Sequence, residues 1–340
     1  MPKIIAFLPD LLYNSFIKIK NISKKDTTQF AWPIIGNSAA LDFLDRSHKL
    51  GNIAQTYIFS GAAGLGKTLT AHCFAERLIF PEKLSNCGDC HIVERLEGKK
   101  NISVDQIREF INILGMSSFS GGRKVGIIKA AETLSLEAAN SLLKLLEEPQ
   151  ADVVLILITS SLDSILPTII SRSQVVNFFP VATDLIRDYL CDNLSTPLEL
   201  ANNLAALSGG RPGRALQFLE DHDFYENYLQ QVQSFLGFFK SDISERLKNI
   251  SLLFDDGEAV VKAAQTIDAW EAVARDLVLS VFNNNDLVAH RNFLPELKEA
   301  VSDLDLTKIT GFFPIFDKAK QYLAANVMPK NVLEYIAINI

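Results

Sequence analysis

Eight consecutive residues at 61–68, Gly-Ala-Ala-Gly-Leu-Gly-Lys-Thr, have the composition and spacing of a phosphate-binding loop. Glycines let successive backbone N–H groups turn toward one anion, the lysine reaches the outer phosphates, and the threonine can bind a magnesium ion. A predicted strand at 56–59 runs into the loop, and a predicted helix at 68–80 follows it and points its N-terminus at the anion. The sequence therefore predicts a pocket for ATP or ADP, with these binding residues: Gly61, Gly64, Gly66, Lys67 and Thr68.

Hydrolysis of the nucleotide needs two further carboxylates, an Asp that helps to hold magnesium and a Glu that positions the attacking water. Both are expected directly after a second strand, but the candidate strand at 124–128 is followed by Lys129 and Ala130. Glu132 comes too late, and we expect its side chain to point elsewhere. The other candidate strand, at 152–159, runs into Thr-Ser-Ser and supplies no acid either.

The missing carboxylates have consequences for both the metal and the reaction. Losing the water-positioning group costs on the order of 100- to 10,000-fold in rate. An ammonium about 4 Å from a divalent cation repels it by several kcal/mol even at an effective dielectric of about 20. We therefore expect nucleotide binding with weak or absent hydrolysis, and we do not expect Mg²⁺ to bind well beside Lys129.

The elements around the loop alternate between strand and helix up to about residue 180, which predicts an α/β domain with a parallel sheet. After Pro180 helical periodicity dominates to the end of the chain. The predicted strands lie at 56–59, 124–128, 152–159 and 175–178, and the predicted helices of this part at 39–50, 68–80, 104–114 and 136–148. The predicted divisions are an extension at 1–30, an α/β domain at 31–180, a small helical domain at 181–216 and an all-helical domain at 217–340.

Composition narrows the functional classes. The net charge of -7, from 33 basic and 40 acidic residues, is not that of a chain that binds DNA by its overall electrostatics. Four cysteines in 340 residues argue against a disulfide scaffold and fit a reducing cytoplasm. No apolar run has the roughly 20 residues of a membrane helix. Residues 1–30 have no cleavage site of a signal peptide, and a loose arm and a docking segment are both open interpretations.

The motifs together resemble the AAA+ subunits of the bacterial DNA polymerase III clamp loader, and within that family its delta-prime type. The stretch at 138–149, Ala-Ala-Asn-Ser-Leu-Leu-Lys-Leu-Leu-Glu-Glu-Pro, is the most specific match. At 167–173, Pro-Thr-Ile-Ile-Ser-Arg-Ser is similar to the Ser-Arg-Cys motif of the family, with Ser173 in the place of the cysteine. The remaining matching stretches are 32–37, 57–60 leading into the loop, 103–108 and 208–216.

The resemblance implies a role in a five-subunit ring whose ATP sites lie between neighbours. Arg172 would be an arginine finger that acts in trans on the ATP of an adjacent motor subunit, although an ion pair on its own surface is the alternative. Thr159 or Ser160 would be sensor 1, and Arg214, rather than Arg211, would be sensor 2; for both sensors an ordinary helix-start or surface role is the alternative. The implied partners are the motor subunits and the delta subunit of the ring and, through the complex, the sliding clamp and primer-template DNA. The helical domains would be a lid at 181–216 and a collar at 217–340.

One departure from the family concerns zinc, which is usually bound by four cysteines in an insertion before the helix at 104–114. Here Cys87 and Cys90 supply two ligands at metal spacing, whereas a tetrahedral site needs four. His91 adjoins Cys90, which is a poor geometry for the same ion, and Cys73 falls within the preceding predicted helix. We therefore expect a shortened hairpin without zinc.

Three functions remain open. The first is a structural subunit, a stator, that offers Arg172 to a neighbour and turns over little or no ATP. The second is an active ATPase motor subunit of the same loader, which Lys129 and Ala130 disfavour. The third is a small-molecule phosphotransferase, which the stretch at 138–149 and the long helical tail disfavour.

Overall fold

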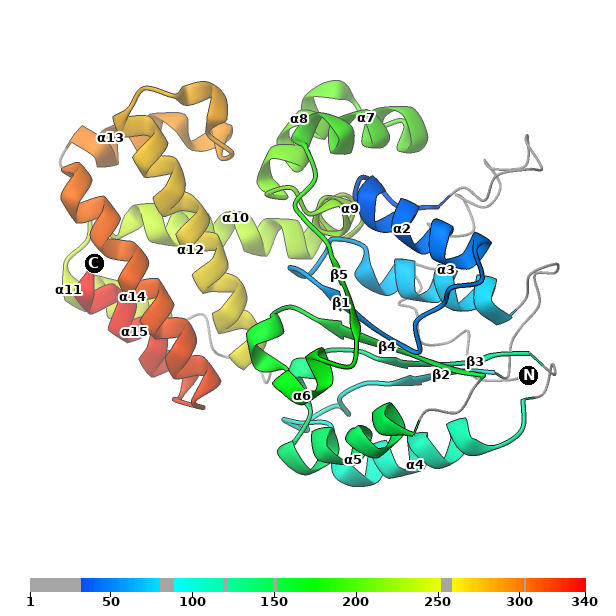
Figure 1. Ribbon diagram of the computed structural model, residues 1–340. Coiled ribbons are helices and arrows are strands. Elements are labelled where there is room, and N and C mark those ends of the chain that lie inside the picture. The colour runs from blue at the N-terminus through cyan, green and yellow to red at the C-terminus, as the bar shows by residue number, and fades with distance from the viewer. Residues whose placement is uncertain (1–31, 80–88, 119–121, 149–151, 252–258, 303) are drawn as a thin grey trace. The chain divides into compact units, whose positions relative to one another are not determined.

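The computed structural model describes residues 32–79, 89–118, 122–148, 152–251, 259–302 and 304–340 (Figure 1). The chain folds into two compact units: the first extends to Leu194 and includes Gly210–Arg214, and the second comprises Ser195–Gly209 and Ala215–Ile340. The predicted extension at 1–30 lies outside the described residues, and the domain boundaries predicted at 180 and 216 stay predictions.

The first unit contains a five-stranded sheet in the order β2-β3-β4-β1-β5, in which all neighbouring strands are parallel. This arrangement confirms the α/β class with a parallel sheet. The elements follow the chain in this order: α2 (Ser38–Lys49), β1 (Thr56–Ser60), α3 (Lys67–Ile79), β2 (Cys90–Val93), α4 (Val104–Gly115), β3 (Lys124–Ile128), the 3-10 turn η2 (Ala131–Thr133), α5 (Leu136–Glu147), β4 (Val153–Thr159), the 3-10 turn η3 (Leu162–Ser164), α6 (Pro167–Ile170), β5 (Gln174–Asn177) and α7 (Thr183–Leu194).

Both faces of the sheet are covered, which explains why its central strands are nearly continuous apolar runs. Tyr57 and Phe59 of β1 belong to the hydrophobic cluster that includes residues of α2 and α3. Ile58, between them, belongs to the cluster on the other face, with residues of α4 and α5. Figure 1 shows these helix pairs on opposite sides of the sheet. The carboxyl ends of the central strands therefore meet at one edge, where the loop at 61–68 begins.

Strand β2 was not predicted. The hairpin expected around Cys87 and Cys90 lies only partly within the described residues, which resume at 89, and it stays a prediction. Residues Cys90–Val93 pair in parallel with β3, with Cys90 opposite Val125 and Val93 opposite Ile128. The strand is short, half-buried and at the edge of the sheet, so it lacks the apolar run that marks β4. The four predicted strands are all present, with ends that shift by at most one residue.

The second unit is helical, and its described residues contain no strand, as the sequence predicts. Its core is rich in aromatic rings, with Phe235 stacked on Trp270 and in contact with Phe312 and Phe316. The elements are α8 (Leu198–Leu207), α9 (Pro212–Glu220, which begins in the first unit), α10 (His222–Gly237), α11 (Ile243–Ser251), α12 (Ala259–Val281), the 3-10 turns η5 (Asn285–Leu287) and η6 (Arg291–Phe293), α13 (Leu294–Ser302), α14 (Leu306–Ala324) and α15 (Pro329–Asn339).

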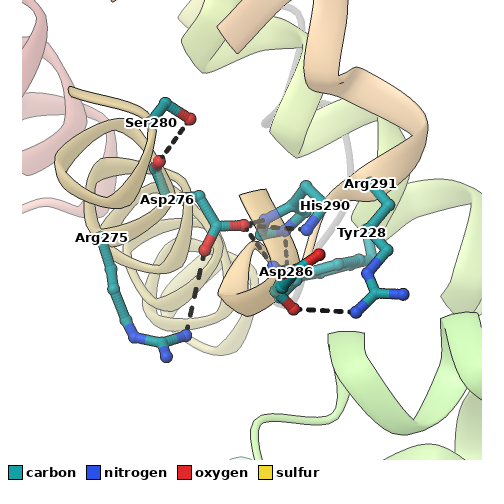
Figure 2. A network of polar contacts seen from close by, with 8 residues as sticks. Tyr228, Arg275, Asp276, Ser280, Asp286, His290 and Arg291 are labelled. Carbon is teal, nitrogen blue, oxygen red and sulfur yellow. Dashed lines mark hydrogen bonds and ion pairs between the residues drawn. The ribbon is translucent and has the colours of Figure 1, made fainter. Parts of the chain in front are cut away.

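A polar network lies inside this helical core (Figure 2). The Oδ2 atom of Asp276, on α12, accepts hydrogen bonds from the backbone N–H groups of Ala289 and His290 at 2.9 and 2.8 Å, and lies 2.7 Å from Nδ1 of His290. The other ring nitrogen of His290 lies 2.8 Å from the hydroxyl of Tyr228 on α10. All three side chains are buried. The network therefore fastens the turn between α12 and α13 to two helices.

Candidate functional site

The loop at 61–68 joins β1 to α3 and has the backbone that a phosphate loop requires. Gly61, Gly64 and Gly66 all have positive φ angles, of 143°, 83° and 89°, a region that side chains disfavour. A Cβ atom on Gly61 would also come within 2.3 Å of the backbone oxygen of Phe178. Helix α3 begins at Lys67, so its first N–H groups face the loop as expected. The structure thus brings the five predicted loop residues together at one helix start.

The side chain of Lys67 folds back onto the start of the loop. Its ammonium donates hydrogen bonds to the backbone oxygens of Gly61 and Ala62, the latter at 2.6 Å, and its side chain is buried. Burial lowers the pKa of Lys67 to about 8, and the negative charge of Glu132 opposes that change. The ammonium therefore lies inside the loop, within hydrogen-bond distance of its backbone.

Two other segments that the sequence singled out lie against the loop. The backbone N–H of Gly213, in the first turn of α9, donates to the oxygen of Gly64 at 2.8 Å. A Cβ on Gly64 would lie 3.4 Å from Cβ of Arg211 and from the backbone nitrogen of Arg214. Ile34, from the stretch at 32–37, lies 3.4 Å from the Cβ position of Gly66. The predicted sensor-2 residue Arg214 is therefore beside the loop through its backbone.

Glu132 lies at the site, contrary to the expectation that its side chain points elsewhere. Its Oε1 atom accepts hydrogen bonds from the hydroxyl of Ser160 at 2.6 Å and from the N–H of Ser160 at 3.3 Å, where β4 ends. The reason is the backbone of Ala130, which adopts a left-handed φ of 50° and directs the chain into η2. A side chain two residues later is thereby brought back toward β4 and the loop.

Lys129 contacts a residue that follows the edge strand β2. Its ammonium forms an ion pair with Oε2 of Glu94 at 3.0 Å, just after β2. The position after β3 thus holds a cation that is already paired, and Ala130 has no polar side chain. These two residues supply neither the carboxylate for a metal nor the group that positions water.

The two sensor-1 candidates differ in their contacts. Thr159 is buried, and its hydroxyl bonds to the backbone of Ser161, donating to the oxygen at 2.8 Å and accepting from the N–H at 3.2 Å. Ser160 instead bonds to Glu132 through both its hydroxyl and its N–H. Thr159 shapes the turn after β4, and Ser160 is the residue connected to the acidic side chain.

Arg172 lies in the turn between α6 and β5 and is paired within its own chain. Its Nη2 atom is 3.1 Å from Oε1 of Glu147, the last residue of α5, and its Nη1 donates to the backbone oxygen of Thr168 at 3.1 Å. The side chain is still 39% exposed. Exposed ion pairs of this kind contribute at most about 1 kcal/mol, so a stronger anion could take the guanidinium from Glu147.

The zinc candidates are only partly described. Cys90 lies in β2, whereas Cys87 lies outside the described residues. Cys73 lies in α3, as predicted. Within the described ranges, no group of three or more His, Cys, Asp or Glu side chains is arranged to bind a metal ion.

His72, on the helix that follows the loop, predicts an acid sensitivity of the first unit. Burial lowers its pKa to about 4, and the charge of Lys129 adds to this effect. Its Nε2 atom is buried with no hydrogen-bond partner among the described residues. Because the folded-state pKa lies below the ordinary value of 6.5, the unfolded chain binds more protons between these two pH values. Stability is therefore lost as the pH falls from 6.5 toward 4, by up to about 3 kcal/mol.

Urea unfolding at several pH values, compared between wild type and His72→Gln, measures this contribution. The free energy of unfolding of wild type, relative to that of the variant, should fall by that amount as the pH falls, because the glutamine does not titrate. His222→Gln, at an exposed position on α10, is the matched control and should parallel wild type. Parallel curves for wild type and His72→Gln would contradict the prediction.

Comparison with known proteins gives the following similarities. The family model "DNA polymerase III, delta subunit" matches residues 36–182. The DNA polymerase III subunit delta' of Pseudomonas aeruginosa is 30% identical over 287 residues, which cover 79% of this chain and 80% of that protein. The protein of the same name from Bacillus subtilis is 22% identical, covering 88% of this chain and 94% of that protein. The DNA polymerase III subunit gamma of Buchnera aphidicola is 30% identical over a shorter part, 44% of this chain and 45% of that protein.

Among the helices that the structure describes, none has the length and apolar character needed to span a bilayer.

Proposed function

We propose, from the premise that this chain belongs to the DNA polymerase III subunit delta' family of clamp-loader proteins, that it is the stator of its loader. In this role it holds the ring together, offers Arg172 to the ATP of a neighbouring motor subunit, and hydrolyses little or no ATP itself. The observation that carries the proposal is a complete phosphate loop combined with the residues Lys129 and Ala130 after β3. The ammonium of Lys129 is paired with Glu94. The site has the means to bind phosphate but not the usual group to activate water.

The contacts of Arg172 support the trans role. The guanidinium is part-exposed in a short turn, where an exposed ion pair with Glu147 and hydrogen bonds to Thr168 and Ser171 hold it. A planar, permanently charged fork of this kind can spread over developing phosphate charge. Its proposed target is the ATP of a motor subunit, in a cytoplasmic ring that also contains the delta subunit and acts on the sliding clamp and primer-template DNA.

For the loop at 61–68 we propose binding of ATP or ADP. The loop glycines, Lys67 at the anion position and the start of α3 support a phosphate ligand. Thr159, Ser160 and Arg214 lie at or next to the loop and are the proposed residues around the outer phosphates.

The second candidate is an active motor subunit, which the partial match to a gamma subunit keeps in view. The ATPase rate of the purified full-length chain separates the two. The stator role predicts a rate at least about 100-fold below that of a motor subunit, because the water-positioning group is missing. A comparable rate would make this chain a motor, and failure to co-purify with a motor subunit would remove it from the ring altogether.

A further inference from the structure

Glu132 is connected to the phosphate loop through the end of β4. Its Oε1 atom binds the N–H and the hydroxyl of Ser160. The preceding residue, Thr159, accepts the N–H of Gly61, the first loop residue, at 3.3 Å. Two adjacent residues, Thr159 and Ser160, therefore contact the loop and the carboxylate, respectively. Lys67 contacts the same loop residue, because its ammonium donates to the backbone oxygen of Gly61.

The second oxygen of this carboxylate is unsatisfied. Oε2 of Glu132 is buried and has no hydrogen-bond partner among the described residues. A buried, charged oxygen without a partner costs free energy, which a cation can offset. The ammonium of Lys67 is close enough for the charge of Glu132 to affect its pKa, but it donates to the carbonyl groups of Gly61 and Ala62. Glu132 thus has a free lone pair at the site where polyphosphate would bind.

A nucleotide in the loop would bring several negative charges near this carboxylate. Without a metal ion the two would repel each other, in a partly buried site where the interaction is stronger than in water. Mg²⁺ removes the repulsion, because it binds phosphate oxygens together with one or two protein carboxylates and keeps several waters. Thr68, at the start of α3, is the loop hydroxyl that could complete such a set.

We propose that Glu132 is the carboxylate that makes nucleotide binding in this loop depend on a divalent cation. Glu132 lies in η2, after the left-handed residue Ala130. In this proposal it supplies the carboxylate for the metal, which Lys129 cannot supply. Turnover is not restored, because one oxygen of Glu132 is bound to Ser160 and residue 130 has no side chain that can position water. The inference rests on the nucleotide pocket of the proposed function and is independent of the role of Arg172.

Titration calorimetry of the full-length chain with ADP and with ATP, in Mg²⁺ or in EDTA, tests the proposal. Wild type should bind about tenfold or more tightly in Mg²⁺ than in EDTA, because the metal removes the repulsion. Glu132→Gln should bind more tightly than wild type in EDTA, so that the Mg²⁺ to EDTA ratio falls to about threefold or less. Lys67→Ala should lose binding in both conditions.

Glu137→Gln is the matched control, because it removes the same charge from an exposed position in the first turn of α5. It should keep the wild-type ratio, and a thermal melt of each variant checks that it is folded. An equal ratio for Glu132→Gln and wild type overturns the proposal. Equal wild-type affinity with and without Mg²⁺ also overturns it, and this comparison needs no variant. Absence of nucleotide binding by wild type overturns it together with the nucleotide pocket, but leaves the effect of Arg172 on a neighbour to be measured separately.

Discussion

Replacing Arg172 with alanine is expected to lower the DNA-stimulated ATPase rate of a reconstituted loader by about 1,000-fold at the one site that it completes. The guanidinium would be lost from the one ATP site that faces this subunit, while sites between other subunits keep their own groups. Total turnover of the ring therefore falls by less than the single-site value. Single-turnover hydrolysis in rings with one wild-type motor subunit next to this chain isolates the affected site.

Arg108→Ala is a suitable control, because Arg108 lies on α4 with a side chain that is 67% exposed and only a distant partner, Asp105, at 3.8 Å. It should leave the rate of the ring unchanged. Glu147→Gln asks the complementary question, because it releases the ion pair that holds Arg172 in the isolated chain. An Arg172→Ala ring with the wild-type single-turnover rate would show that the ion pair with Glu147 is the whole role of this arginine.

Replacing Asp276 with alanine is expected to destabilise the helical second unit by about 3–5 kcal/mol. Its Oδ2 atom is the acceptor for two backbone N–H groups and lies against the ring of His290, and all of these groups are buried. Alanine would leave the donors without an acceptor inside the core, which costs more than the loss of the bonds themselves. Urea unfolding followed by the fluorescence of Trp270, in a Trp32→Phe background, reports on this unit because the chain contains two tryptophans.

Two further variants show whether the acceptor or the charge matters. Asp276→Asn keeps an oxygen that can accept the same N–H groups, so its loss of stability should be clearly smaller than that of Asp276→Ala. Asp317→Ala changes an exposed aspartate of α14 and should cost about 0.5 kcal/mol or less. A loss below about 1 kcal/mol for Asp276→Ala would mean that water replaces the carboxylate in this core.

The parts of the fold that the sequence predicts well are those with long apolar runs or a strong motif. β4 is buried along its whole length, and its near-continuous apolar run predicts a strand covered on both faces. The glycine spacing predicts the loop, and the helical pattern that follows the loop predicts α3. By contrast, β2 has four half-buried residues, and its pairing with β3 depends on a neighbour more than thirty residues away in the chain.

The site was only partly predictable, for a reason that involves one backbone angle. The residue types at 129 and 130 predict that the two usual carboxylates are missing after β3, but the position of Glu132 depends on the left-handed conformation of Ala130. Alanine rarely adopts that conformation, so nothing in the sequence announces the turn. The network of Asp276, His290 and Tyr228 was missed because its members are far apart in the chain. A signal was present, since Asp276 interrupts a buried helix face formed with Val273 and Leu277.

Glu132 lies in η2, and Glu147 is the last residue of α5. The two carboxylates bind opposite ends of the segment 160–172, at Ser160 and at Arg172. The stretch at 160–172 contains only short helical turns, so it has few backbone bonds of its own to resist opening. Contacts with η2 and α5 therefore stabilise the segment 160–172, and Ser135 caps the start of α5. Amide hydrogens in the two stretches should exchange with solvent in a common opening event. The position of Arg172 would then depend on the stability of α5, a helix that does not contain it.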